Sequence, residues 1–286
     1  KKMRTIKIIS VIIFSIVLFS CKEKDRKKEQ SVKEKVEILE PNIDLNEIET
    51  NFIKWWTYYG NNISLSSSFI GLDENSDTID KSKFLEKLIT SNYIPLKIKS
   101  NAEIKTYKLY ELDSNADKSI GKTIKNESLK NLKHLKMEGQ GLPEFNFFDL
   151  IGNNYTNENT KGKTIILKTW FINCKACVAE FPELNEFVEK YKQKNEVVFV
   201  SLALDTKSEL EKFLQKRDFK YQVVPDQKEF IEKLNLQIYP SHLLVDENGT
   251  ILKVVNKASE MIAFFEKEQI ITKEKVNRKT PPPPPM

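Results

Sequence analysis

The stretch Lys168-Thr-Trp-Phe-Ile-Asn-Cys-Lys-Ala-Cys-Val-Ala-Glu-Phe-Pro-Glu-Leu-Asn185 places Cys174 and Cys177 at C-x-x-C spacing. Residues 164–170 are apolar and β-branched, as in a buried strand, whereas residues 178–191 carry apolar side chains at helical spacing. Cys174 is therefore predicted at the start of a helix. Unpaired backbone N–H groups and the helix dipole favour a thiolate there, and the thiolate is the form that attacks a disulfide. Cys177 lies one turn later, where it could resolve the product.

The composition excludes several classes of protein. The chain has 286 residues, enough for one large or two modest domains, and its net charge of +5 is spread along the sequence. No basic face with interleaved aromatic residues is evident, so we predict no nucleic-acid partner. None of the eight glycines forms a phosphate-binding loop. Two histidines and three cysteines cannot supply a standard zinc site beyond the C-x-x-C pair, so no metal is predicted.

The first 41 residues have the features of an export signal and a spacer. A basic start and the apolar run 8–19 predict a signal peptide over residues 1–21. The sequence Leu18-Phe19-Ser20-Cys21 resembles a bacterial lipobox, which implies a lipid on Cys21; the alternative is an uncleaved anchor helix. Either reading predicts a protein of the cell envelope, held at a membrane. Residues 22–41 are charged and should form a disordered tether.

Residues 42–138 predict a small α+β accessory region. Aromatic residues at helical spacing usually belong to a core, so Trp55 and Trp56 are predicted to be core residues. His134 is predicted to be a surface helix residue. The patterns predict two helices and two strands, over residues 45–59, 81–90, 93–99 and 105–112.

Residues 139–271 alternate between strand and helix patterns, which predicts an α/β domain with a central sheet covered on both faces. After them, residues 272–286 end in five prolines and a methionine and predict an extended, disordered tail. The predicted strands are 164–170, 196–203, 221–224, 242–246 and 250–256, and the predicted helices are 175–193, 207–217, 227–235 and 258–269.

Four features of this second domain resemble the thioredoxin-like TlpA/ResA family of membrane-attached thiol-disulfide oxidoreductases. They are the hairpin pattern of residues 142–150, Trp170 with the C-x-x-C pair, Pro182 in the following helix, and Tyr239-Pro240 before a terminal hairpin. The resemblance implies a thioredoxin-like fold, with a mixed sheet flanked by helices. It also implies a redox-active disulfide between the two cysteines and no other cofactor.

The resemblance further implies a substrate groove beside the cysteines. A cis peptide bond at Pro240 would bring the Tyr239 backbone alongside them, where an extended substrate chain could pair. Asn173 stands where the family usually has Trp, so one wall of the groove is smaller and more polar. Substrate preference is therefore left open.

An acid is implied near the resolving cysteine. The resembling family often has a partly buried acid at the position of Glu180, which could move protons on and off Cys177 with a pKa raised by burial. The alternative is a solvated helix residue near Lys175. Trp170 is predicted to be core, and His242 is set aside as a satisfied core residue.

These features predict an enzyme that carries out thiol-disulfide exchange, with Cys174 exposed and attacking and Cys177 buried and resolving. Its partners would be envelope proteins bearing disulfides or thiols, on the periplasmic or outer surface of a bacterial membrane. The resemblance favours reduction, which requires a membrane-embedded electron donor. The direction is not decided by the residues themselves.

Two alternatives remain. A peroxiredoxin-like peroxidase would need a Pro-x-x-x-Thr-x-x-Cys arrangement, but Thr169 lies five residues before Cys174 and no proline precedes it at the right distance. The other alternative is a non-catalytic thioredoxin-like lipoprotein that binds a partner and holds the cysteines as a structural disulfide.

Overall fold

The computed structural model describes residues 43–99, 104–194 and 196–279. The predicted signal peptide, the lipid attachment at Cys21 and the tether therefore lie outside the described residues. Within the described ranges, no helix is both long enough and apolar enough to cross a membrane.

The accessory region folds around its own four-stranded sheet, in the order β2-β1-β4-β3, with β1 and β4 parallel. Its core includes Trp55, which is fully buried, whereas Trp56 is 43% exposed, so the core prediction is confirmed for the first tryptophan only. The predicted helix 45–59 is two helices, because the Asn51 side chain caps a new helix by accepting the Lys54 N–H. The elements are α1 (Leu45–Glu49), α2 (Phe52–Asn62), β1 (Ile70–Leu72), β2 (Thr78–Ile79), α3 (Lys81–Ile89), β3 (Tyr93–Ile98), β4 (Thr106–Glu111) and α4 (Lys118–Met137).

Strands β1 and β2 and helix α4 were not among the elements that the patterns predicted, although His134 of α4 was expected to lie in a helix. Polar residues occupy part of the buried face of α4, including Ser128 and His134, which hides the helical periodicity of the apolar ones. Gly121 permits close packing, since a Cβ there would lie 2.7 Å from the Ser91 carbonyl oxygen. The prediction that His134 lies on the surface is wrong, because only 3% of it is exposed. Burial, followed by the charge of nearby lysines, lowers the pKa of His134 to about 4.

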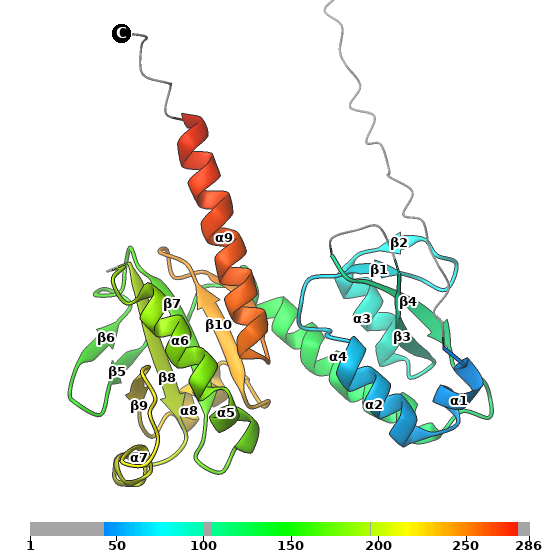
Figure 1. Ribbon diagram of the computed structural model, residues 1–286, viewed down its shortest axis with the longest axis horizontal. Helices are drawn as coiled ribbons and strands as arrows, with labels where there is room; N and C mark the ends of the chain where they lie inside the picture. Colours follow the sequence, from blue (N-terminus) through cyan, green and yellow to red (C-terminus); the bar gives the residue numbers. More distant parts are fainter. Residues whose placement is uncertain (1–42, 100–103, 195, 280–286) are drawn as a thin grey trace, which may run out of the picture. The chain divides into compact units, whose positions relative to one another are not determined.

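The C-terminal region contains a mixed five-stranded sheet, as predicted, most of whose strands are labelled in Figure 1. The strand order is β11-β10-β7-β8-β9. Strands β7, β8 and β9 run parallel, and β10 is antiparallel to both β7 and β11. The hairpin β5–β6 precedes this sheet. The elements are β5 (Asn146–Phe148), β6 (Asn154–Thr156), β7 (Thr164–Trp170), α5 (Lys175–Ala179), α6 (Phe181–Tyr191), β8 (Val197–Ala203), α7 (Lys207–Leu214), β9 (Gln222–Val224), α8 (Lys228–Lys233), β10 (Ser241–Val245), β11 (Ile251–Val255) and α9 (Ala258–Lys279).

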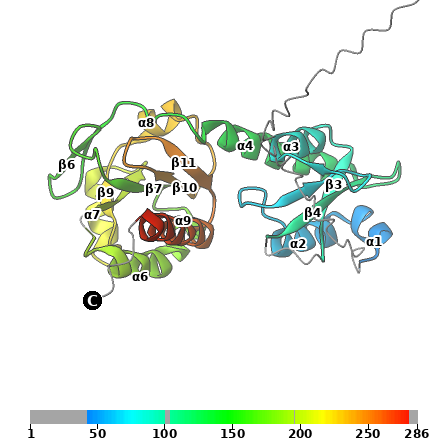
Figure 2. The ribbon, with the colours of Figure 1, turned by 90° about the horizontal axis from the view of Figure 1, so that it is seen from above.

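Helices cover both faces of this sheet. Figure 2 shows α6 and α9 on one face and α8 on the other. Ile166 of β7 packs with Leu184 of α6 and Phe265 of α9, whereas the next residue, Leu167, packs with Ile231 of α8. This alternation is what a strand buried on both faces requires.

Two helices differ from their predicted extents. The predicted helix 175–193 is broken at Glu180, because Pro182 has no N–H to donate to the Val178 carbonyl. Helix α9 continues to Lys279, well beyond the predicted end at residue 269, so the first eight residues of the predicted tail are helical. No proline occurs in this stretch until residue 281, and residues 266–279 are rich in Glu and Lys, which favour helix. The prolines themselves lie outside the described residues.

Candidate active site

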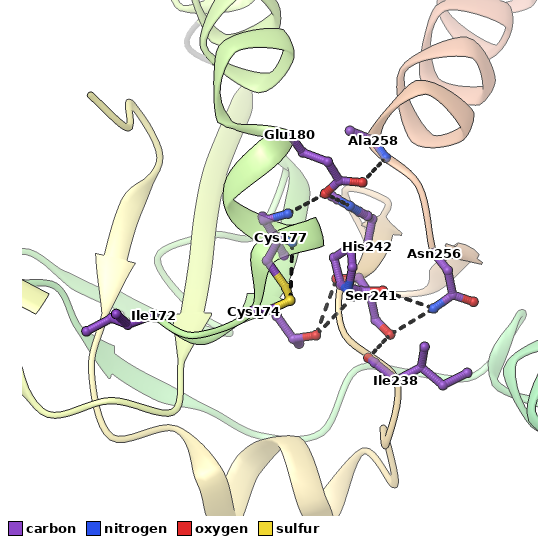
Figure 3. The surroundings of a disulfide bond; sticks show 12 residues. Ile172, Cys174, Cys177, Glu180, Ile238, Ser241, His242, Asn256 and Ala258 are labelled. Carbon is purple, nitrogen blue, oxygen red and sulfur yellow. Dashed lines mark hydrogen bonds and ion pairs between the residues drawn. A yellow bond between two sulfur atoms is a disulfide. The ribbon is translucent and has the colours of Figure 1, made fainter. Parts of the chain in front are cut away.

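The two cysteines meet at the start of helix α5, where they form a disulfide (Figure 3). Cys174 is the N-cap residue, and its Sγ accepts the backbone N–H of Cys177 at 3.2 Å. Cys177 is fully buried, and Cys174 is 8% exposed. The order of exposure is as predicted, but Cys174 is more enclosed than predicted because aromatic and aliphatic side chains surround the disulfide.

The segment before Cys174 is fixed from two sides. The backbone N–H of Ile172 donates to the Asp205 carboxylate at 2.8 Å. Burial raises the pKa of Asp205, although the hydrogen bond from Ile172 opposes this. Trp170 is fully buried, which confirms its predicted place in the core, and its Nε1 donates to the Ser201 hydroxyl. The position of the first cysteine is therefore set by hydrogen bonds as well as by packing.

The residues predicted to line a groove lie around this segment. The peptide bond between Tyr239 and Pro240 is cis, as predicted. The Tyr239 ring packs edge-on against Phe171, with ring centroids 5.4 Å apart, and belongs to the apolar cluster that holds the cysteines. Asn173 is exposed and directly precedes Cys174. The three predicted groove residues thus come from two segments that meet near the disulfide.

Two polar side chains interrupt the face of the sheet that α6 and α9 cover. Lys168 of β7 and His242 of β10 stand directly opposite each other in the antiparallel register, and both are 0% exposed. Residues at such positions have neighbouring side chains on the same face. A buried lysine without a partner is strongly unfavourable, so this position requires an acid.

Glu180 supplies that acid from the break between α5 and α6 (Figure 3). One carboxylate oxygen lies 2.5 Å from the Lys168 ammonium and 3.0 Å from His242 Nε2, and the other accepts the Ala258 N–H at 2.9 Å. Burial alone would raise the pKa of Glu180, but the interactions with His242 and Lys168 outweigh it and lower the pKa to about 2. The expectation of a raised pKa is therefore wrong, and so is the alternative of a solvated residue near Lys175.

Sequence reasoning missed Lys168 and set aside His242. The signal for Lys168 was available, because a lysine within a strand predicted to be buried must find an opposite charge. His242 is buried, as expected, but it is not fully satisfied: its Nδ1 has no hydrogen-bond partner. Burial lowers the pKa of His242, opposed by its hydrogen bond to Glu180.

The geometry also bears on the alternatives. The Thr169 hydroxyl is engaged in the sheet, where it accepts the Ser241 N–H at 3.2 Å, so it is committed to the β7–β10 pairing rather than to the cysteine. No group of three or more His, Cys, Asp or Glu side chains that could hold a metal ion occurs among the residues that the structure describes.

Comparison with known proteins finds similarity in the C-terminal region of the chain. The family model described as Redoxin matches residues 137–271. The thioredoxin-like protein YneN of Bacillus subtilis is 31% identical over 116 residues, which cover 40% of this chain and 68% of YneN. The thiol-disulfide oxidoreductase ResA of Bacillus cereus is 31% identical over 125 residues, which cover 43% of this chain and 72% of ResA.

Similar solved structures match a region of comparable size. The thioredoxin domain of a thiol-disulfide oxidoreductase from Bacteroides vulgatus aligns with a TM-score of 0.42 and 24% identity, over 46% of this chain and 96% of that domain. A thiol-disulfide oxidoreductase from Bacteroides fragilis aligns with a TM-score of 0.41 and 17% identity, over 45% of this chain and 98% of that one.

Proposed function

From the premise that the chain belongs to the TlpA/ResA family of thioredoxin-like thiol-disulfide oxidoreductases, we propose that it reduces disulfide bonds in proteins of the bacterial cell envelope through Cys174 and Cys177. The observation that carries this proposal is the asymmetry of the pair. One sulfur belongs to the N-cap residue of a helix and retains some exposure, while the other is fully buried one turn later. Such a pair has one thiol suited to attack and one suited to resolve.

The exchange proceeds in two displacements. In the reduced protein, the Cys174 thiolate attacks one sulfur of the substrate disulfide, and the other substrate sulfur leaves as a thiolate that takes up a proton. Cys177 then loses its proton and attacks the Cys174 sulfur, which releases the second substrate thiolate. The protein dithiol is oxidised to the disulfide, and the substrate gains two electrons and two protons.

Substrate binding is assigned to the groove residues. The Tyr239-Pro240 segment offers backbone at the edge of the site, and an extended substrate strand could pair with it. Asn173 contributes an exposed amide where the family usually has an indole. A small, polar wall would favour disulfides flanked by polar residues over those in apolar segments.

The proposal includes the direction of electron transfer and the cellular location of the protein. A dithiol in an oxidising compartment must be reduced again after each turnover, so we assign a membrane-embedded dithiol donor as the second partner. The lipobox-like sequence ending at Cys21 supports attachment to a membrane on the periplasmic or outer side. The Cys174–Cys177 disulfide is the redox group, with no other cofactor.

The first experiment traps the intermediate in cells. Cys177→Ser should accumulate adducts on Cys174 that migrate at higher mass and disappear on treatment with dithiothreitol. Cys174→Ser, which keeps the buried thiol only, is the matched control and should accumulate none. If neither variant forms adducts, exchange on protein substrates is wrong and a structural disulfide is favoured.

The second experiment tests the direction. Acid quenching followed by alkylation should find the wild-type pair mostly reduced in growing cells. The reduction potential of the purified protein should lie closer to that of thioredoxin, about −270 mV, than to that of the oxidant DsbA, about −120 mV. A pair that is oxidised in cells and has a potential near the second value would make the protein an oxidase.

A further inference from the structure

Lys168 and His242 contact Glu180, three residues after Cys177, and have no place in the exchange reaction. We propose that both are positioning residues that hold Glu180 as a permanent negative charge one helical turn after Cys177, so that Glu180 does not carry protons during the redox cycle. The inference rests on the proposed use of the cysteine pair and adds to it the residues that set its electrostatics.

The geometry gives the carboxylate three donors from three elements. Lys168 comes from β7, His242 from β10, and the Ala258 N–H from the first turn of α9. A carboxyl group that accepts three hydrogen bonds is stabilised in its ionised form, and a proton on either oxygen would compete with a donor. The Ala258 N–H is fixed by the backbone, and the Lys168 and His242 side chains are fully buried, so the carboxylate has little freedom to turn toward the sulfurs.

The protonation state of His242 follows from its unpartnered nitrogen. Nε2 faces a carboxylate oxygen and must therefore donate, which leaves Nδ1 as the lone-pair nitrogen of a neutral imidazole. Protonation would place an N–H on Nδ1, which is buried and has no partner. A buried donor without an acceptor is unfavourable. His242 therefore acts as a neutral donor, and the charge that balances Glu180 is that of Lys168.

The remaining groups that face this cluster do not supply another positive charge. Glu183 of α6 has a pKa raised by burial and by the charge of Glu180. Tyr221, before β9, is fully buried, and its phenol pKa is raised by burial and then by Glu180. The charge of Glu260 on α9 opposes the lowering of the His242 pKa by burial. Within the described residues, Lys168 is the cation that pairs with Glu180, and His242 contacts the same carboxylate oxygen as a neutral donor.

A permanent charge on Glu180 affects the pKa values of the two thiols that form when the disulfide is reduced. Reduction of the disulfide adds two electrons and, below the thiol pKa values, two protons, and both protons go to sulfur. The negative charge of Glu180 raises the thiol pKa values, whereas the positive charge of Lys168 lowers them. Removing one partner should therefore move the thiol pKa in one direction, and removing the other should move it in the opposite direction.

The test measures the redox equilibrium of the protein's own cysteine pair with glutathione from pH 4.5 to 8, together with the alkylation rate of Cys174. Below the thiol pKa values of both partners, the equilibrium constant of the wild type should not change with pH, because glutathione gives up the two protons that the protein cysteines take up, and no break should come from Glu180. Glu180→Gln should keep this flat profile below the thiol pKa values and lower the pKa of Cys174, so that alkylation at pH 5 is about threefold to tenfold faster.

Lys168→Met should give the opposite result. The uncompensated Glu180 should now take up a proton within the measured range, which adds a break to the pH dependence. Alkylation of Cys174 should be slower above that break. The double variant Lys168→Met/Glu180→Gln should return toward the wild type, because the removed charges cancel. Glu189→Gln, an exposed acid on α6, is the matched control and should not differ from the wild type.

Two outcomes would overturn the inference. A break in the wild type that disappears in Glu180→Gln would show that Glu180 carries a proton in the cycle. Equal profiles for the wild type, Glu180→Gln and the double variant would show that the cluster does not act on the thiols. If Lys168→Met fails to fold, these three proteins still decide the question. Because no protein substrate is used, a failure to reduce protein disulfides would count against the proposed function and not against this inference.

Discussion

Two glutamates, Glu180 just before helix α6 and Glu189 within it, have similarly lowered pKa values but lie in different environments. The pKa of Glu180 and that of Glu189 are both lowered to about 2. The Glu180 side chain is 16% exposed and pairs with a lysine that is fully buried. Glu189 is 41% exposed, and its two lysine partners, Lys192 and Lys220, are also on the surface.

The two glutamates show that a lowered pKa does not by itself measure how much an ion pair contributes to the stability of the fold. On the surface, water and salt screen the charges, and each side chain loses freedom when it pairs. In the interior, the two charges have been removed from water, so losing one leaves the other without compensation. The same shift therefore predicts little effect at Glu189 and a large one at Glu180.

Glu180→Ala is the substitution with the largest expected effect. It leaves the Lys168 ammonium buried without a partner, and it removes an acceptor from His242 and from the Ala258 N–H. We expect the free energy of unfolding to fall by about 3–5 kcal/mol in urea denaturation. Glu189→Ala should be indistinguishable from the wild type. Similar losses in both variants would mean that Lys168 finds water or another acceptor in the fold.

The second prediction concerns acid. The folded-state pKa of Glu180 is about 2, below its ordinary value of 4.5, so the stability it contributes is complete above about pH 4.5 and is lost as the pH falls toward 2. Denaturation curves from pH 5 to 3 should show this loss, up to about 3 kcal/mol when complete. Glu180→Gln should remove this part of the pH dependence.

High salt should distinguish the contributions of Glu180 and Glu189 to the acid dependence of stability. In 1 M NaCl, the acid dependence that comes from Glu189 should disappear, because its pairs are exposed and screened. The part that comes from Glu180 should persist. If 1 M salt removed the whole acid dependence, the Glu180 cluster would have to be accessible to water.

Much of the fold could be predicted from local patterns in the sequence, because strands such as 164–170 and 250–256 have local causes. The cysteine pair and Pro240 were found because they are rare residue types at diagnostic spacing. Glu180 was singled out, but its pKa was assigned in the wrong direction. The direction of the shift depends on Lys168 and His242, which come from strands β7 and β10, and no local pattern in the sequence indicates that they meet Glu180.

The break before α6 offers a third, smaller test. Pro182 cannot donate to the Val178 carbonyl, but the three donors to Glu180 also hold the chain in its bent path. Pro182→Ala should therefore cost about 1 kcal/mol or less, mainly through the greater freedom of the unfolded chain. Its acid dependence should match that of the wild type. Loss of the Glu180 part of that dependence would mean that the proline itself aims the carboxylate inward.

The smallest effect on stability is expected at the surface ion pair between Lys220 and Glu189. Lys220 lies 2.6 Å from Glu189 and is 35% exposed, and Lys192, one turn along α6, can compensate when Lys220 is removed. Lys220→Met should leave the urea midpoint at physiological salt unchanged and reduce only its sensitivity to salt at low ionic strength. The measurement is the urea midpoint at 20 mM and 500 mM NaCl, beside Lys168→Met as the buried counterpart. A marked loss of stability in Lys220→Met at both salt concentrations would show that screening does not distinguish the two glutamates, and the contrast drawn from their burial would then be wrong.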